Sequence, residues 1–243
     1  MKALIIEDDI VCANGIARLL DNHGISADIC NTAEDGIYMI ESWSYDITLV
    51  DLCLPGVSGQ QFIQEIRSLN KSNKKNMPII VLSNLEKADD KVEAFLNGAD
   101  DFICKPIEKK EFIMRVLTAI RRNNGHSSNN ISIGEITLNL REKSIYIKNK
   151  QINFSNKQYN LFQLLIMKQN NILTKREILD SLYGGEKVPG MKIVDVLVCN
   201  IRKEIKKYTD NDYLDTVWGM GYRIINPNRR TIGSEEINES IIY

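Results

Sequence analysis

Residues 47–59 read ITLVDLCLPGVSG, and this stretch decides the fold. The apolar run 47–50 ends at Asp51, and Pro55-Gly56 and Ser58-Gly59 follow it closely. A short apolar run bounded by turn residues is typical of a fully buried strand. We therefore predict a buried strand with a carboxylate at its carboxyl end.

The same pattern recurs through the first half of the chain. Apolar runs predict strands at 3–6, 26–30, 47–50, 79–82 and 101–104. Amphipathic stretches between them predict helices near 10–23, 33–43, 59–69, 87–97 and 109–122. Strands that alternate with helices predict an α/β fold with a doubly wound, five-stranded parallel sheet. Its functional crevice lies beyond the carboxyl ends of the strands.

Charge divides the chain into two parts. Residues 1–122 carry 19 acidic and 14 basic residues, whereas residues 123–243 carry 13 acidic and 17 basic residues. The polar segment 123–130, NNGHSSNN, predicts a linker between two domains. An acidic half beside a basic half suggests two functions, the basic one on nucleic acid.

Several classes of protein are excluded by composition. No apolar run approaches the roughly 18 residues of a membrane span, so we expect no membrane partner and a cytoplasmic location. The five cysteines are scattered and contain no C-x-x-C pair, which argues against structural zinc and favours reduced thiols.

Charged and polar residues follow the predicted parallel strands and should converge at one edge. Glu7 and Asp8 follow the first strand, Asp51 the third, Ser83 closes the fourth, and Lys105 follows the fifth. Carboxylates that repel one another need a cation, and hard oxygen ligands suit Mg²⁺. Lys105 and Ser83 are suited to hold phosphoryl oxygens, and an Asp carboxylate is able to accept a phosphoryl group. The alternative is that these are ordinary acidic residues on the surface. It would explain one such residue at a strand end, but it explains the whole set less well.

Four motifs carry a family resemblance: LIIEDD (4–9), LVDLCLPGVSG (49–59), PIIVLSN (78–84) and GADDFICKPI (98–107). They resemble the successive motifs of two-component receiver domains over residues 1–122. The resemblance implies that Asp51 is the phosphoacceptor, served by a histidine kinase or histidine phosphotransferase. It also implies further site residues, namely Glu7, Asp8, Asp51 and the backbone carbonyl of Cys53 for Mg²⁺, Ser83 and Lys105 for the phosphoryl group, and Phe102 as an aromatic switch.

An enzymatic alternative also uses an Asp nucleophile at a strand end. Haloacid-dehalogenase-like phosphatases resemble D-x-D, with the second Asp as general acid. Cys53 stands at that position here and cannot do that work. We therefore expect a regulator and not an enzyme.

The charged last receiver helix and its neighbours resemble the dimer face of OmpR/PhoB-family receivers. The resemblance implies a two-fold homodimer held by the cross-subunit ion pairs Lys91–Glu111, Asp101–Arg115 and Asp100–Arg122. The alternative is that these are solvated helix charges, and each such pair contributes little alone.

Residues 131–227 predict a second domain of the α+β class. Alternating segments at 131–140 and 144–154 predict a small antiparallel sheet, and helical patterns follow at 156–169, 175–183 and 191–208. Two short strands around Gly219-Met220-Gly221 complete a winged-helix pattern. Residues 228–243 are polar, and we expect a disordered tail.

Basic residues on the third helix predict contact with double-stranded DNA. Apolar residues at helical spacing, Val196 among them, should face the core and leave Lys203 and other basic residues outside. Residues 131–230 carry 17 basic and 10 acidic residues. The segment resembles the OmpR/PhoB winged helix, which implies groove contacts by Lys192, Asn200 and Arg202, and phosphate contacts by Lys175, Tyr183, Thr216 and Tyr222. The turn 184–190 would be available to RNA polymerase.

Two departures from that family affect base recognition. Many members have Arg where Trp218 stands, so Arg223 is the nearest substitute, and many have Arg at Cys199 and Asn200. The segments LYGG, KIVDV, C-x-I-R-K and TVWG-x-GY resemble the CtrA branch, which implies a cell-cycle role. Two alternatives remain: a phosphate sink whose second domain binds protein, and a DNA-binding protein that ignores phosphorylation.

Overall fold

The computed structural model describes residues 1–69, 72–85, 87–169, 171–183 and 189–227. Its first half contains five strands and six helices among the described residues: β1 (Lys2–Ile6), α1 (Ile10–Asp21), β2 (Ser26–Cys30), α2 (Ala33–Ser42), β3 (Ile47–Val50), α3 (Gly59–Ser68), α4 (Ser72–Lys75), β4 (Ile79–Ser83), α5 (Ala88–Leu96), β5 (Asp101–Cys104) and α6 (Lys109–Asn123). The strands form one sheet in the order β2-β1-β3-β4-β5, and every pairing in it is parallel. The predicted fold of this half is confirmed.

The sheet is covered on both faces because its strands are apolar throughout. Alternate residues of β1 enter different clusters: Ala3 and Ile5 pack with α1 and α6, whereas Leu4 and Ile6 pack with α2, α3 and α5. All four side chains are fully buried. This two-sided burial is the reason that the strands read as continuous apolar runs.

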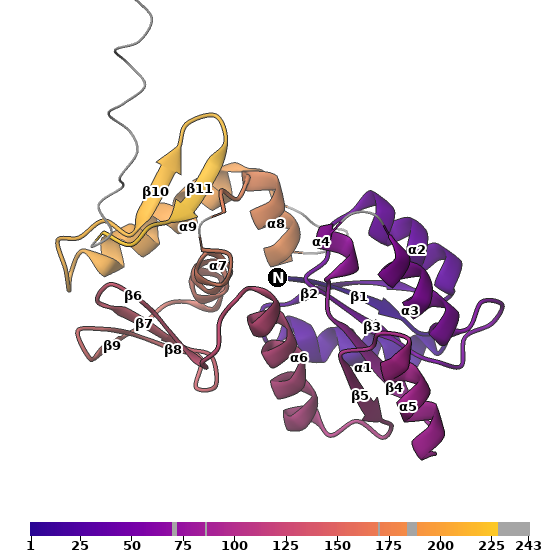
Figure 1. Cartoon of the computed structure of the whole chain (residues 1–243). Helices are drawn as coiled ribbons and strands as arrows, with labels where there is room; N and C mark the ends of the chain where they lie inside the picture. The colour runs from indigo at the N-terminus through magenta and orange to yellow at the C-terminus, as the bar shows by residue number, and fades with distance from the viewer. Residues whose placement is uncertain (70–71, 86, 170, 184–188, 228–243) are drawn as a thin grey trace, which may run out of the picture.

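The second half combines a four-stranded antiparallel sheet, three helices and a hairpin (Figure 1). Its elements are β6 (Asn130–Ile133), β7 (Ile136–Asn139), β8 (Ser144–Ile147), β9 (Lys150–Ile152), α7 (Asn156–Met167), α8 (Lys175–Tyr183), α9 (Lys192–Ile205), β10 (Leu214–Val217) and β11 (Gly221–Ile224). Leu173, before α8, forms a β-bridge with Tyr222 of the hairpin. The hairpin is the wing of a winged helix, as the sequence predicts.

One local expectation differs from the structure, and one predicted segment is packed more closely than its composition indicates. Val196, which the sequence predicts in the core, is 51% exposed, because it shares the outer face of α9 with Lys192 and Asn200, one helical turn away on either side. The predicted linker 123–130 is short and packed: α6 extends to Asn123, and β6 begins at Asn130. The polar composition of this segment does not indicate that His126 is buried.

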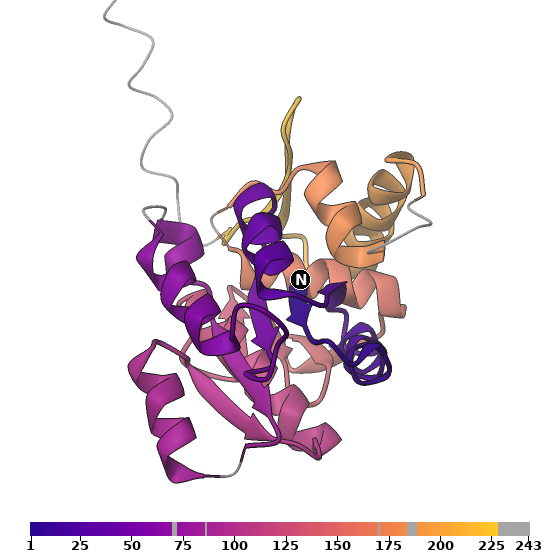
Figure 2. The ribbon, with the colours of Figure 1, turned by 90° about the vertical axis from the view of Figure 1, so that its right-hand side faces the viewer.

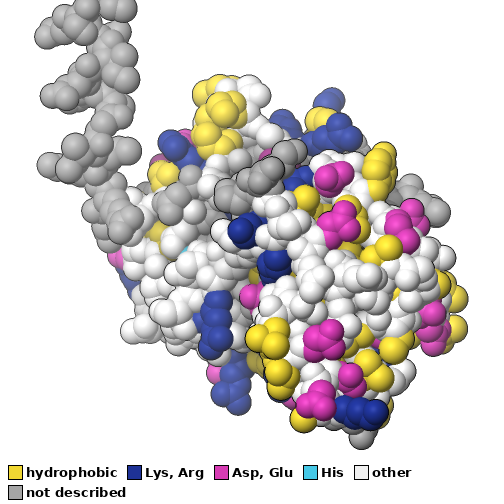
Figure 3. All heavy atoms as spheres, turned by 45° about the vertical axis from the view of Figure 1, so that its right-hand side comes forward, with side chains coloured by type: hydrophobic (Ala, Val, Ile, Leu, Met, Phe, Trp, Pro, Cys, Tyr) yellow, Lys and Arg dark blue, Asp and Glu magenta, His cyan; other side chains and the backbone are white. Residues whose placement is uncertain are grey.

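The two halves lie side by side, with the amino ends of the parallel strands turned toward the winged helix (Figures 1 and 2). In Figure 3, most acidic side chains in view lie on the receiver half. Within the described residues, no helix is long and apolar enough to cross a membrane.

Candidate phosphorylation site and nucleic-acid interface

Three carboxylates meet at the carboxyl edge of the parallel sheet. Glu7 and Asp8 follow β1, Asp51 follows β3, and each offers an oxygen within 4.8 Å of the others. Glu7 is 2% exposed and Asp51 is 4% exposed, whereas Asp8 is open to solvent. Buried like charges at this distance repel one another, so the arrangement favours a bound cation.

Lys105 supplies part of that positive charge. It follows β5, and its Nζ donates to Glu7 Oε2 and to Asp51 Oδ2, each at 2.6 Å. Burial opposes the charge of Lys105, but the hydrogen bonds to Asp51 and Glu7 outweigh it and raise the pKa of the ammonium. Three carboxylates and one ammonium leave two negative charges, which suits a divalent cation.

The backbone around Asp51 orients its carboxylate. The amide of Cys53 donates to Asp51 Oδ1 at 3.0 Å, while Lys105 binds the other oxygen. A Cβ at Gly59 would lie 2.2 Å from the Asp51 carbonyl, so only glycine lets α3 approach this closely. The need for Gly59 was not recognised from the sequence, although the Ser58-Gly59 pair at the start of α3 marks the position.

Ser83 and Phe102 lie on adjacent strands beside this pocket. Ser83 is buried at the end of β4, and its Oγ accepts from the Leu85 amide at 3.1 Å. Phe102 is 8% exposed and therefore already inward, with Lys91 Nζ 5.7 Å from the centroid of its ring. The inward position is present without phosphorylation, and the switch role of Phe102 stays a prediction.

The donor set fits Mg²⁺. Carboxylate oxygens from Glu7, Asp8 and Asp51 are the hard ligands that this ion prefers, and the exposed Asp8 leaves room for water and a phosphoryl oxygen. Asp9 instead caps α1, because its Oδ1 accepts from the amides of Val11 and Cys12. Cys53 remains a candidate ligand only through its backbone carbonyl.

Four of the six predicted dimer residues, Asp100, Asp101, Glu111 and Arg115, are paired within the single chain. Arg115 donates to Asp101 at 2.9 Å and to Glu111 at 2.8 Å, both on its own receiver. Asp100 is held by Arg67 at 2.7 Å. Cross-subunit pairs by Asp101 and Asp100 would therefore have to replace these contacts.

The exposed face of α9 carries the residues expected to read DNA. Lys192, Asn200 and Lys203 are exposed, together with Val196 and Cys199. The opposite face packs on the core through Val194, Leu197, Val198, Ile201 and Ile205. An outer face of this kind, with two basic residues and an amide, suits a nucleic-acid groove.

Arg202, which the resemblance places in the groove, makes hydrogen bonds within the second domain. Its guanidinium donates to the Leu214 carbonyl at 2.8 Å and to Thr216 Oγ1 at 2.7 Å. Both acceptors lie on β10, so Arg202 joins α9 to the wing. Thr216 is engaged in the same contact.

A second network holds Lys175 and Tyr222 around Asp195. Lys175 Nζ lies 2.7 Å from one carboxylate oxygen of Asp195, and the buried Tyr222 hydroxyl donates to that same oxygen at 2.5 Å. Burial and the bond to Asp195 raise the pKa of Tyr222 to about 12. Sequence reasoning missed Asp195, although it is the only acidic residue in the first turn of α9.

Tyr183 and Arg223, the remaining predicted contacts, also have partners within the chain. Lys157 covers the ring of Tyr183, with its Nζ 4.2 Å from the centroid, and Arg223 pairs with Asp215 at 2.8 Å. Trp218, beside the tip of the wing, is 90% exposed. The turn 184–190 and the tail 228–243 fall largely or wholly outside the described residues.

Comparison with known proteins identifies the class. The family model described as "Response regulator receiver domain" matches residues 3–117, and "Transcriptional regulatory protein, C terminal" matches residues 149–224. The chain therefore belongs to the two-component response regulators with an OmpR/PhoB-type DNA-binding domain. It is a transcription regulator, and the recognition of its family from the sequence is confirmed.

The chain resembles CtrA regulators over nearly its whole length. It is 36% identical over 231 residues to the "Cell cycle transcriptional regulator CtrA" of Caulobacter vibrioides, covering 95% of this chain and 98% of the relative. It is 34% identical over 229 residues to the "Cell cycle response regulator CtrA" of Brucella ovis, covering 94% and 97%. Response regulator DrrB of Thermotoga maritima, an OmpR/PhoB homologue, is 21% identical, with coverage of 92% and 98% and a TM-score of 0.45.

Proposed function

We propose that Mg²⁺-dependent phosphorylation of Asp51 controls promoter binding by the winged-helix domain. The observation that carries this proposal is the buried Asp51 carboxylate, whose two oxygens are oriented by Lys105 and the Cys53 amide. A bound Mg²⁺ would neutralise charge on the phosphoryl group and the carboxylates. Glu7, Asp8 and Asp51 would hold the ion, with the Cys53 carbonyl as a further ligand.

The donor in the cell is a phosphohistidine, of a histidine kinase or histidine phosphotransferase, although the same pocket should also accept a phosphoryl group from a small-molecule donor. A carboxylate oxygen of Asp51 forms a bond to phosphorus while the bond from phosphorus to the donor imidazole breaks. Lys105 then moves one of its hydrogen bonds to a phosphoryl oxygen, and Ser83 donates to another. The phosphoryl group brings about 1.5 to 2 negative charges to a site beside Glu7 and Asp8.

The output is dimerisation through the receiver and binding to double-stranded DNA. In the dimer, Asp101, Arg115 and their neighbours would exchange internal pairs for the cross-subunit pairs described above. Lys192, Asn200 and Lys203 would face the groove, and Lys175 would lie near phosphates. We further propose action in the cytoplasm, contact with RNA polymerase through the turn 184–190, and a cell-cycle role like that named for the CtrA relatives.

The test of the site is phosphate incorporation by an Asp51→Asn variant. Incubation with a small-molecule phosphodonor and Mg²⁺ should add one phosphoryl group to the wild-type chain and none to Asp51→Asn. Asp101→Asn is the matched control, because it makes the same change outside the pocket. Equal incorporation in Asp51→Asn and wild type, measured by intact mass, would refute the assignment.

A further inference from the structure

The edge of the receiver sheet opposite to Asp51 forms a second, extensive contact. The amino ends of β1, β2 and β3 lie together at this edge because the strands are parallel and in register. Met1 precedes β1, Gly24 lies two residues before β2, and Asp46 precedes β3. These segments pack against α7 and α8 of the winged helix (Figure 1). The contact is thus remote from the phosphorylation site.

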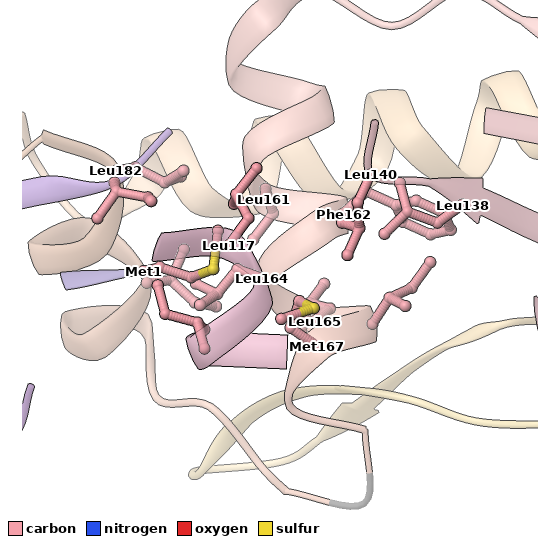
Figure 4. Close-up of a cluster of buried hydrophobic side chains, with 14 of the residues drawn as sticks. Met1, Leu117, Leu138, Leu140, Leu161, Phe162, Leu164, Leu165, Met167 and Leu182 are labelled. Atoms are coloured by element: carbon pink, nitrogen blue, oxygen red, sulfur yellow. The ribbon is translucent and has the colours of Figure 1, made fainter. Parts of the chain in front are cut away.

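The centre of this contact is apolar and continuous with the cores of both halves. Met1 and Leu117 from the receiver meet Leu161 and Leu164 of α7 and Leu182 of α8 (Figure 4). All five side chains are buried. Such packing resembles a domain core, whereas a loose contact between mobile domains is more polar.

Polar contacts surround the apolar centre and connect the same elements. Lys168, at the end of α7, places its Nζ 2.8 Å from Asp46 Oδ1, and the buried Asp46 also accepts from the Lys2 amide at 2.8 Å. Ser26 Oγ donates to the Asp180 carbonyl of α8 at 3.1 Å. If Lys168 lost its charge while the contact stayed closed, the buried Asp46 carboxylate would lose a partner at a cost that opening relieves, so the closed arrangement depends on this pair.

Two further features restrict how the two halves are arranged: the close approach of α7 to Gly24 and the packing of the linker. A Cβ at Gly24 would lie 2.4 Å from the side chain of Asn160, so α7 lies against this turn. Within the linker, a ring nitrogen of His126 lies 3.1 Å from the Met167 carbonyl, and Arg121 donates to the His126 carbonyl at 2.9 Å. The linker therefore adds little freedom while these contacts last.

We propose that this contact is a latch that restricts which arrangements of two DNA half-sites the dimer can bind. While the latch is closed, the two-fold symmetry of a receiver pair fixes the distance and orientation between its two α9 helices. Other spacings or orientations require the latch to open in at least one protomer. The inference rests on the proposed function, namely dimerisation and DNA binding. It adds a contact that affects which DNA sites are bound although it touches no base.

The test compares the wild-type chain with Lys168→Glu, which places a carboxylate beside the buried Asp46. Lys150→Glu, an exposed position on β9, changes the net charge equally and serves as control. Lys168→Met removes the charge but keeps the aliphatic stem, and is the milder second variant. Far-ultraviolet circular dichroism establishes that each variant is folded.

Opening is measured first, without DNA, by the rate of proteolytic cleavage in residues 123–130. Cleavage that tracks the open population should be about tenfold faster in Lys168→Glu and unchanged in Lys150→Glu. Equal cleavage rates in wild type and in all the variants would overturn the proposal of a latch.

Site selection is measured second, on a library of paired half-sites that differ in orientation and spacing, with the receivers activated by beryllofluoride and Mg²⁺. Wild type and Lys150→Glu should select a narrow set, and Lys168→Glu and Lys168→Met a broader one. If the opened variants select the same narrow set, the latch does not determine the arrangement. Failure of the proposed function has a different signature, because the activated wild type would then remain monomeric in sedimentation.

Discussion

At the residue scale, Lys105 determines whether two buried carboxylates are tolerated at the sheet edge. Its ammonium lies 2.6 Å from both Glu7 and Asp51, which are almost inaccessible to water. The sequence predicted this convergence because parallel strands place their carboxyl ends at one edge. It did not predict the orientation of Asp51 by the Cys53 amide, which depends on the path of the turn after β3.

Replacement of Lys105 by Met should therefore destabilise the receiver and make its stability depend on Mg²⁺. Loss of one partner of a buried ion pair costs about 3–5 kcal/mol of unfolding free energy. A divalent cation between the carboxylates should recover part of that loss. Urea unfolding with and without Mg²⁺ measures the effect, with Lys109→Met, an exposed position on α6, as control. Equal stability of Lys105→Met and wild type without Mg²⁺ would show that Lys105 does not offset these charges.

At the scale of elements, α9 and the wing act as one unit, since Arg202 joins them. Helical periodicity predicted most of the buried face of α9 but misplaced Val196, because an apolar residue alone does not distinguish a core from a DNA-binding face. The groove contact of Arg202, which the family resemblance implies, stays a prediction. Its bonds to β10 could not be predicted from the sequence, because their acceptors lie 12 and 14 residues away and are visible only in the folded chain.

Asn200→Ala and Arg202→Ala should consequently have different effects on DNA binding. Loss of a bidentate base contact by Asn200 should relax preference at one base pair, at a cost of roughly 1–3 kcal/mol. Arg202→Ala should loosen the wing, weaken binding to all sequences and lower the thermal midpoint of unfolding. A binding selection on randomised DNA, with melting curves for each variant, distinguishes the two. If Arg202→Ala instead relaxes the base preference at one position and leaves the thermal midpoint of unfolding unchanged, Arg202 contacts a base in the groove.

Trp218→Arg should increase the salt dependence of DNA binding. The side chain is almost fully exposed on the wing and carries no charge, so an Arg there adds one possible phosphate contact. The slope of log affinity against log salt should steepen by about one unit. Trp43→Arg, an exposed position after α2 in the receiver, controls for the added charge. An unchanged slope in Trp218→Arg would place the tip of the wing away from the DNA backbone.

At the scale of the whole molecule, the receiver presents two edges with different roles. The carboxyl edge holds Asp51, and the amino edge packs on the winged helix. The division into an acidic and a basic part was evident from composition, but the packing between them was not. Asp46 and Lys168 are 122 positions apart in the sequence, and no local pattern connects them. The polar composition of the linker did not indicate that His126 within it is buried.

Activation should couple Asp51 to dimerisation through the charged receiver face. Beryllofluoride with Mg²⁺ should shift the full chain from monomer to dimer in sedimentation. Arg115→Glu should oppose this shift, because it removes the partner of Asp101 and places like charge beside it. Arg141→Glu, an exposed position in the winged helix, is the control. Undiminished dimerisation of Arg115→Glu would place the interface elsewhere.

The most direct test of phosphorylation control is a titration of one promoter fragment with wild type and Asp51→Asn, each with and without beryllofluoride and Mg²⁺. The account predicts that the mimic raises the affinity of wild type and leaves Asp51→Asn unchanged at its unactivated value. Equal affinities of wild type in both conditions, with the mimic shown by intact mass under native conditions to be bound, would contradict it.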